Sequence, residues 1–325
     1  MLQACQRADL TRAAHLLRAG HLVALPTETV YGLAADALNP LAVSKVFEVK
    51  GRPLLDPLIV HGLHAAMLAE IAHFGATARD LADRFWPGPL TLVLSRRSSV
   101  PHLVTAGLDT VAVRAPAHPA FRRVLARSRL CLAAPSANPF GYLSPTRAAH
   151  VAASLGPRLS HIVDGGPCTH GLESTILSLA NPSQPMILRP GPIGPKALAK
   201  VLGEAPPLRR RKPTVGEALE APGTSERHYS PRTPLTLFDK QPPRPNSTQT
   251  ATVWLKRPAI TETGPTFWLS EPGSFKEAAA NCFDLLRRLD ADPSITQIRC
   301  QVPGSAAQDS LAVALRDRLL RAAAG

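Results

Sequence analysis

The sequence has 325 residues, 45% of them hydrophobic, so it can bury one large core or two ordinary ones, and its length favours two domains. It has no run approaching the roughly 20 apolar residues that cross a bilayer, no secretory segment and no Cys-x-x-Cys pair among its five cysteines, which favours a cytoplasmic protein without a structural zinc site. The net charge of +13, from 29 arginines and 8 lysines, suits an anionic partner such as a nucleotide or RNA, although an arginine-rich genome would give the same bias.

Helical and strand-like segments alternate over the first 203 residues. The first helix ends where Gly20 permits a left-handed cap. The second begins after Asn39, a helix start signal, and delivers Lys50 and Arg52 at its C-terminal end. In chain order, the expected elements are helix 7–19, strand 21–26, helix 41–49, strand 58–61, helices 65–71 and 76–84, and strands 90–95, 110–114, 130–134, 162–166, 174–179 and 186–189.

The composition changes abruptly after residue 204. Residues 205–234 are rich in proline, glycine and charge, with a basic run from Arg209 to Lys212, and they predict an extended linker. Strands and helices alternate again beyond it. The expected elements there are strands 235–238, 252–255 and 266–269, helix 275–289, strand 295–302 and helix 310–323.

This order of elements predicts an α/β (α+β) fold with two domains. Residues 1–204 are expected to form the larger domain, residues 205–234 a linker, and residues 235–325 a smaller Rossmann-like domain.

Two cations, Lys50 and Arg52, flank Gly51 and precede a proline. This spacing can aim both side chains at one anion, while the glycine lets the backbone approach closely. The same residues would also suit a solvated helix end, and no Walker-type glycine loop accompanies them.

Polar residues also follow or line the expected strands. Ser136, Asn138 and Ser144 come after strand 130–134, and open α/β sheets bind ligands at the carboxyl ends of their strands. Such residues form ordinary turns as well. Thr110 and Arg114 share one strand face, so both can reach one site, although a lone arginine there would also suit a surface position.

The acidic residues Glu28, Asp36 and Glu173 are candidates either for magnesium contact or for exposed surface. Glu173 precedes two hydroxyls, Ser174 and Thr175, in a pattern that a capped turn would also give. The sequence has no Gly-x-Ser-x-Gly elbow and no His-Glu-x-x-His helix, so serine or zinc hydrolysis has little support. The remaining possibility is a reaction catalysed by positioning the substrates and neutralising phosphate charge, as in phosphoryl and nucleotidyl transfer.

Six motifs, in order over residues 1 to about 203, resemble the YrdC-type threonylcarbamoyl-AMP synthases. They are Pro26-Thr-Glu-Thr-Val-Tyr-Gly-Leu, Lys50-Gly-Arg-Pro with Pro57-Leu-Ile-Val-His61, Pro135-Ser-Ala-Asn138, Ser144-Pro-Thr, Gly171-x-Glu-Ser-Thr175 and Leu188-Arg-Pro-Gly191. The segments Pro222-Gly, His228-Tyr229-x-Pro, Leu285-Leu-Arg-Arg-Leu-Asp290 and Asp317-Arg-Leu are similar to the longer, two-domain branch. The resemblance implies that residues 1–204 form a YrdC-like catalytic domain, a twisted mixed sheet flanked by helices. It also implies that the linker 205–234 covers the active site and that residues 235–325 form the Rossmann-like domain.

The resemblance also implies an activity. L-threonine, bicarbonate or CO2, and ATP would give threonylcarbamoyl-AMP and pyrophosphate, with Mg²⁺ held through ATP rather than by protein ligands alone. The product would serve N6-threonylcarbamoyl modification of adenosine in tRNA, through downstream tRNA-modifying transferase partners. Whether tRNA itself contacts this chain is left open by the sequence.

Site residues are carried over position by position. The threonine site implied by the resemblance comprises Thr29, His61, Arg114, Ala134 and Ser174. The implied ATP site comprises Arg52, Asp56, Thr110, Ser136, Asn138, Ser144, Arg189, His228 and Tyr229. Lys50 and Arg52 would be the catalytic cations, and His228 and Tyr229 would close over the site. The family usually has Asn where this chain has Asp56, so a carboxylate there needs either Mg²⁺ or Arg52 as its partner.

Two alternatives stay open at the level of sequence. A carbamoyl-transfer module of the hydrogenase-maturation type resembles the same domain, but it normally comes with an acylphosphatase segment and Cys-x-x-Cys zinc motifs, which this sequence lacks. A non-enzymatic RNA-binding protein would use the +13 charge and the basic run from Arg209 for phosphate contacts.

Overall fold

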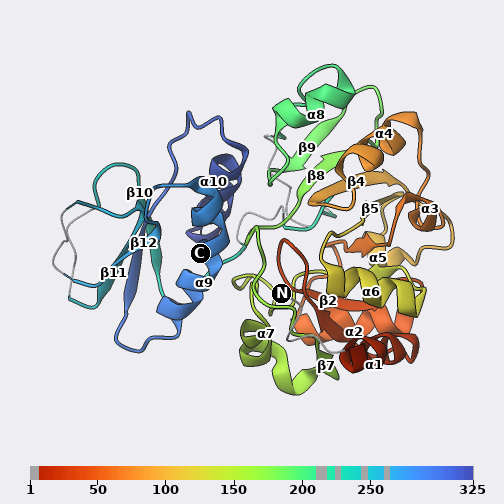
Figure 1. Cartoon of the computed structure of the whole chain (residues 1–325), viewed down its shortest axis with the longest axis horizontal. Helices are drawn as coiled ribbons and strands as arrows, with labels where there is room; N and C mark the ends of the chain where they lie inside the picture. The colour runs from red at the N-terminus through yellow and green to blue at the C-terminus, as the bar shows by residue number, and fades with distance from the viewer. Residues whose placement is uncertain (1–6, 210–217, 224–227, 243–247, 260–263, 325) are drawn as a thin grey trace.

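The computed structural model describes residues 7–209, 218–223, 228–242, 248–259 and 264–324. It contains a large mixed sheet in the N-terminal part of the chain and a smaller sheet near the C-terminus (Figure 1). Of the predicted basic run, only Arg209 lies within the described residues. None of the helices in these ranges is long and apolar enough to cross a membrane.

The N-terminal domain is built around a nine-stranded sheet of order β7-β1-β2-β6-β3-β5-β4-β8-β9. Its helices are α1 (Arg7–Arg18), α2 (Pro40–Lys50), α3 (Ala65–Leu68), α4 (Ala76–Phe85), α5 (His102–Thr105), α6 (Pro119–Ser128), α7 (Ala148–Leu155), the 3-10 turn η1 (Gly156–Arg158) and α8 (Pro195–Leu202). Its strands are β1 (Val23–Leu25), β2 (Gly32–Asp36), β3 (Ile59–His61), β4 (Leu90–Ser95), β5 (Thr110–Arg114), β6 (Leu132–Ala133), β7 (His161–Ile162), β8 (Thr175–Ser178) and β9 (Met186–Arg189).

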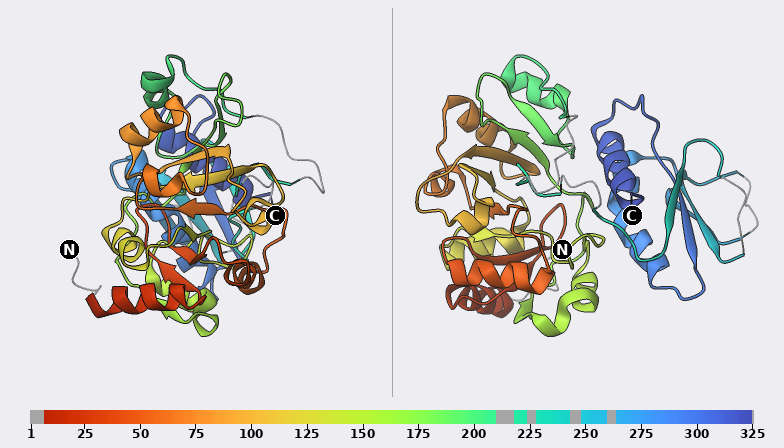
Figure 2. Two further views of the ribbon diagram at one scale, coloured as in Figure 1. Left: turned by 90° about the vertical axis from the view of Figure 1, so that its right-hand side faces the viewer. Right: turned by 180° about the vertical axis from the view of Figure 1, so that it is seen from behind.

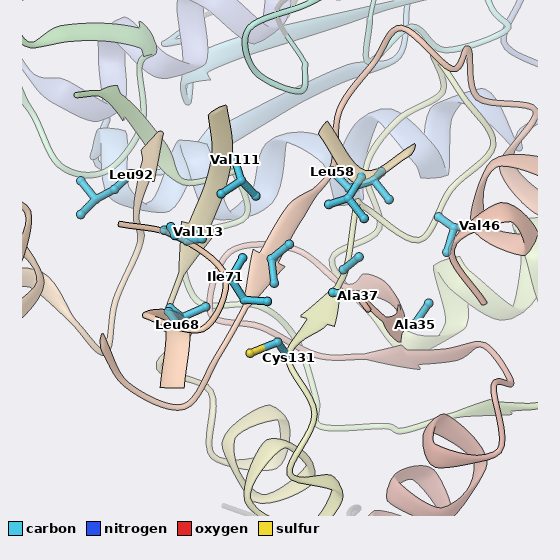
Figure 3. Packing of buried hydrophobic residues seen from close by; sticks show 14 of the residues in the cluster. Ala35, Ala37, Val46, Leu58, Leu68, Ile71, Leu92, Val111, Val113 and Cys131 are labelled. Atoms are coloured by element: carbon cyan, nitrogen blue, oxygen red, sulfur yellow. The ribbon is translucent and has the colours of Figure 1, made fainter. Parts of the chain in front are cut away.

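Alternation along the strands divides the apolar residues between the two faces of this sheet. On one face, Val111 and Val113 of β5 join the cluster that α2, α4 and α8 cover. Figure 3 shows Val113 near Leu68 and Ile71 in this cluster. On the other face, α1 and α6 cover one part of the sheet, whereas Ala112 of β5 packs with Ala221 of the linker. The second face therefore carries helices at one end and the linker at the other.

The C-terminal domain has a four-stranded parallel sheet of order β10-β13-β11-β12, as expected for a Rossmann-like unit. Its elements are β10 (Leu235–Phe238), β11 (Thr250–Lys256), β12 (Thr266–Ser270), α9 (Phe275–Asp290), β13 (Gln297–Gln301) and α10 (Ser310–Ala322). Both helices lie between this sheet and the N-terminal domain (Figures 1 and 2). Residues of α9 and α10 therefore face the larger domain.

Several sequence expectations need correction. Strand β2 was missed because its sequence, Gly-Leu-Ala-Ala-Asp, lacks the β-branched and aromatic residues typical of strands. Helices α5, α6, α7 and α8 were also missed; α6 and α8 each begin with a proline, which breaks a helix interior but suits a first helical turn. The helix expected at 65–71 ends at Leu68, and the strand expected at 162–166 is only His161–Ile162.

Candidate active site

A cavity with about 50 Å³ of free space lies on the face of the large sheet that α6 and the linker share. His61 and Arg114 are the last residues of the parallel strands β3 and β5, and they are direct partners in register. The carboxyl ends of parallel strands are a usual place for ligands. Of the predicted site residues, the cavity is lined by Thr29, Arg52, His61, Arg114, Ala134, Ser136, Ser174, Arg189, His228 and Tyr229.

Arg114 is held in place by three partners at one end of the cavity. Its guanidinium donates to the Gly88 carbonyl at 3.1 Å, to Thr29 Oγ1 at 3.0 Å and to Glu28 Oε1 at 2.6 Å. Burial alone would raise the pKa of Glu28, but the Arg114 charge, the hydrogen bond from Arg114 and two backbone hydrogen bonds together outweigh burial and lower it. Glu28 is therefore an ionised partner of Arg114 rather than a surface residue.

His61 stands beside Arg114 as a neutral imidazole. Burial, reinforced by the Arg114 charge, lowers its pKa to about 3. Nδ1 lies 3.1 Å from the Ile59 carbonyl oxygen, which can only accept, so Nδ1 carries the hydrogen. The ring also contacts Phe121 of α6, with 5.3 Å between ring centroids. His61 therefore adds a fixed polar group to the cavity without adding a charge.

Arg52 and Asp56 form a buried ion pair, with 2.8 Å between Nη2 and Oδ1. Arg52 also donates to the carbonyls of Asp56 and Pro57. The Asp56 carboxylate thus meets Arg52, one of the two partners considered from the sequence. The alternative of a solvated helix end is wrong for this segment, because Lys50, Arg52 and Asp56 are all buried.

Lys50 does not line the cavity. Its ammonium lies 2.5 Å from the carbonyl oxygens of both Ser136 and Asn138, and so ties the end of α2 to the loop that follows β6. Burial, with the neighbouring Arg52 charge, lowers the pKa of Lys50 well below its ordinary value. In this arrangement, Lys50 positions Ser136 at the cavity wall.

Arg189 connects β8, β9 and the linker. It donates to the carbonyl and to the hydroxyl of Ser174, both at 3.2 Å, and to the Pro222 carbonyl at 3.0 Å. Ser174 Oγ also lies 2.7 Å from the Thr91 hydroxyl. The hydroxyl of Ser174 is thereby fixed at the cavity wall.

Four linker residues, Pro222, Gly223, His228 and Tyr229, cover the cavity and are called the lid. The Tyr229 ring stacks on Phe283 of α9, with 5.6 Å between centroids, and the His228 ring meets Phe140 of the N-terminal domain at 5.7 Å. His228 Nδ1 and the Tyr229 hydroxyl are buried and make no hydrogen bond to the part of the chain that the structure describes. Such groups are costly to bury unless a ligand or water satisfies them.

Two family models together match almost the whole chain. A model described as "Telomere recombination" matches residues 15–191, and one described as "Threonylcarbamoyl-AMP synthase, C-terminal domain" matches residues 193–324. The chain belongs to the threonylcarbamoyl-AMP synthase family. The predicted family, fold class and enzyme class are confirmed, in preference to the RNA-binding and carbamoyl-transfer alternatives.

Individual relatives agree with this assignment. Threonylcarbamoyl-AMP synthases of Pyrococcus abyssi and Bacillus subtilis are both 44% identical, over 70% and 73% of this chain and 67% and 68% of their own lengths. The structure of P. abyssi Sua5 complexed with L-threonine superimposes with a TM-score of 0.85 at 35% identity, covering 97% of this chain and 94% of that one.

Some predicted residues of this synthase family member lie outside the cavity wall. Thr110 begins β5 but does not line the cavity, although it shares a strand with Arg114. The Asn138 amide donates to the carbonyls of Pro139 and Tyr142, and so shapes the loop after β6. Ser144 is buried behind the wall, where it donates to Glu173 at 2.5 Å. The roles assigned to these residues stay predictions.

One residue that borders the site was not predicted from the sequence. Arg318 of α10 pairs with Glu173, 145 positions away in the chain, at 2.8 Å. Glu173 itself was considered only as a magnesium contact or as surface, and the structure shows it buried between Arg318 and Ser144. The segment Asp317-Arg-Leu is part of the resemblance to the two-domain branch, but that resemblance gives Arg318 no role, and only the fold reveals this contact.

Replacing Glu28 with Gln should lower the free energy of unfolding by about 3 kcal/mol at pH 7, because buried Arg114 loses its counterion. The pKa of Glu28 is lowered in the folded chain, so its stabilising effect is complete above the unfolded carboxyl pKa and fades as the pH falls through the folded one. The difference in unfolding free energy between variant and wild type should therefore become smaller at acidic pH. Urea unfolding at pH 7, 5 and 3.5 measures it, and a constant difference would contradict the ion pair.

Proposed function

We propose that this chain forms threonylcarbamoyl-AMP and pyrophosphate from L-threonine, bicarbonate or CO2, and ATP, and that its cavity has an amino-acid side and a nucleotide side. The observation that supports this division most is the pair of buried arginine clusters. Arg114 lies beside Thr29 and His61, whereas Arg52 and Arg189 lie toward the lid. Fixed guanidinium groups of this kind suit carboxylate and phosphate.

On the amino-acid side, Arg114 is the partner for the threonine carboxylate. Its guanidinium is already oriented by Glu28 and Gly88, so the side chain loses little conformational entropy when the substrate binds. The neutral His61 adds no second cation beside Arg114, so it does not repel threonine, which arrives with its amine protonated and loses that proton before it attacks carbon. Ser174 supplies a fixed hydroxyl at the boundary between the two sides.

On the nucleotide side, Arg52 and Arg189 face the phosphates, and Lys50 holds the loop that presents Ser136. The threonine amine attacks CO2 to give N-carboxythreonine, with one proton lost from nitrogen. Its new carboxylate then attacks the α-phosphorus of ATP, and pyrophosphate leaves with the bond electrons. Negative charge grows on the phosphate oxygens, where the guanidinium groups offset it.

We propose that Mg²⁺ comes with ATP. Within the described ranges, no group of three or more His, Cys, Asp and Glu side chains suits a metal ion, and the three carboxylates nearest the cavity are engaged by arginines. The phosphates are thus its main ligands, and the bound ion would offset charge on the leaving pyrophosphate.

The lid must open before ATP can bind. Ligand pockets usually measure about 300–1,000 Å³, whereas about 50 Å³ is free beneath the lid. Closure over bound substrates would exclude the water that hydrolyses a mixed anhydride. The unpaired polar atoms of His228 and Tyr229 would then find partners on the nucleotide. We expect the product to pass to tRNA-modifying transferase partners.

Release of pyrophosphate from ATP tests the proposed reaction. The purified chain should release pyrophosphate only when both L-threonine and bicarbonate are present, since N-carboxythreonine, the acceptor of the adenylyl group, forms from those two. A coupled pyrophosphate assay with each component omitted in turn measures this. Release that persists without threonine would contradict the proposal.

Replacing Asp56 with Asn tests the nucleotide side. The ligand-free variant should lose about 3 kcal/mol of unfolding free energy, because buried Arg52 loses its counterion. Saturating ATP should restore part of this loss, since a phosphate can take the place of the carboxylate. Urea unfolding with and without ATP measures both values. An identical loss in the two conditions would place ATP away from Arg52.

A further inference from the structure

Arg318, in the last helix of the chain, is fully buried against the N-terminal domain. Its Nε lies 2.8 Å from Glu173 Oε2, and its Nη2 donates to the Pro190 carbonyl at 3.0 Å. Its guanidinium carbon lies 5.3 Å from the centre of the Tyr229 ring, a cation–π distance. One side chain of α10 therefore contacts three segments that surround the cavity.

These three segments carry the residues proposed to bind substrate. Glu173 lines the cavity and directly precedes Ser174, and its other oxygen accepts from Ser144. Pro190 follows Arg189 at the end of β9. Arg318 does not line the cavity itself, so any effect on substrate must pass through its neighbours.

The charge of Glu173 depends on this contact. The groups that face it are Arg318 from α10, Arg189 from β9, Tyr229 from the lid and Cys282 from α9. Burial would raise the pKa of Glu173, and the Arg318 charge is the strongest influence that lowers it. Without Arg318, a buried carboxylate would stand beside the proposed phosphate site with only Arg189 to offset it.

We propose that Arg318 is a positioning residue of the synthase, through which the C-terminal domain holds Glu173, the Pro190 turn and the lid in the geometry that binds ATP. The inference rests on the proposed function of the cavity. The C-terminal domain then has a specific role, because α10 neutralises Glu173 and fixes the neighbouring hydroxyls Ser144 and Ser174. Lysine can replace this guanidinium only in part, because it offers one point charge rather than two fixed donor directions.

The test uses the full chain with Arg318→Met, Arg318→Lys and the double variant Arg318→Met/Glu173→Gln. Arg147→Met is the matched control, because Arg147 makes an interdomain ion pair with Asp284 at 2.7 Å away from the cavity lining. Values of kcat and KM for ATP and for L-threonine are measured from pH 6 to pH 9. Unfolding midpoints accompany each variant.

At pH 8, Arg318→Met should lower kcat/KM for ATP at least tenfold, and the loss should shrink toward pH 6 as Glu173 takes up a proton. Arg318→Lys should recover part of the activity. At pH 8, the double variant should have a higher kcat/KM for ATP than Arg318→Met, because it has no unpaired buried charge. For the same reason, its kcat/KM should not show the additional pH dependence expected of Arg318→Met. Arg147→Met should keep the wild-type KM for ATP.

Wild-type kinetics and pH profile in Arg318→Met, or an equal loss in Arg147→Met, would overturn the proposal. If Arg318→Met does not fold, the double variant provides the test. The proposal then requires that its KM for ATP be higher than that of the wild type and not vary with pH. A wild-type KM for ATP in the double variant would overturn the proposal. A wild-type chain that shows no threonine-dependent release of pyrophosphate would instead contradict the proposed function.

Discussion

Buried arginines that are only partly neutralised are the constraint on which the rest of this structure depends. The guanidinium groups around the cavity are those of Arg52, Arg114, Arg189 and Arg318, and the carboxylates that face them are those of Asp56, Glu28, Glu173 and Asp317. Burying such charges is costly unless each finds a partner. Arg189 forms no ion pair within the described residues, and Arg52, Arg114 and Arg189 present fixed cations to the cavity, where the threonine carboxylate and ATP phosphates would complete the neutralisation.

The same requirement explains why the two domains are joined so closely. Arg287 of α9 donates to the carbonyls of Leu143 and Ser144, and Arg318 of α10 donates to Glu173 and Pro190. Each of these arginines thus satisfies backbone or carboxylate oxygens of the N-terminal domain. The C-terminal domain thereby becomes part of the support for the active site.

Much of the fold and part of the site could be predicted from sequence. Strands β3 and β5 have clear apolar runs, and their last residues, His61 and Arg114, were correctly expected to approach one site. Strand β2 was not predicted, because its small residues have a low intrinsic preference for strands and adopt this structure through packing. Lys50 was expected to face phosphate, yet it binds backbone carbonyls, because spacing along a chain does not fix the direction of a long side chain. Arg318 lies in a segment that the resemblance included, but its contact with Glu173 crosses the domain boundary, and the sequence alone assigned it no role.

The affinities of the chain for L-threonine and for L-threonine amide test most directly whether substrate anions neutralise the buried arginines. The two molecules differ only at the carboxylate that Arg114 is proposed to hold. Calorimetric titration of the wild-type chain should show binding of L-threonine and an affinity for the amide at least about thirtyfold weaker, the usual consequence of leaving a buried charge without its partner. Equal affinities would contradict the account.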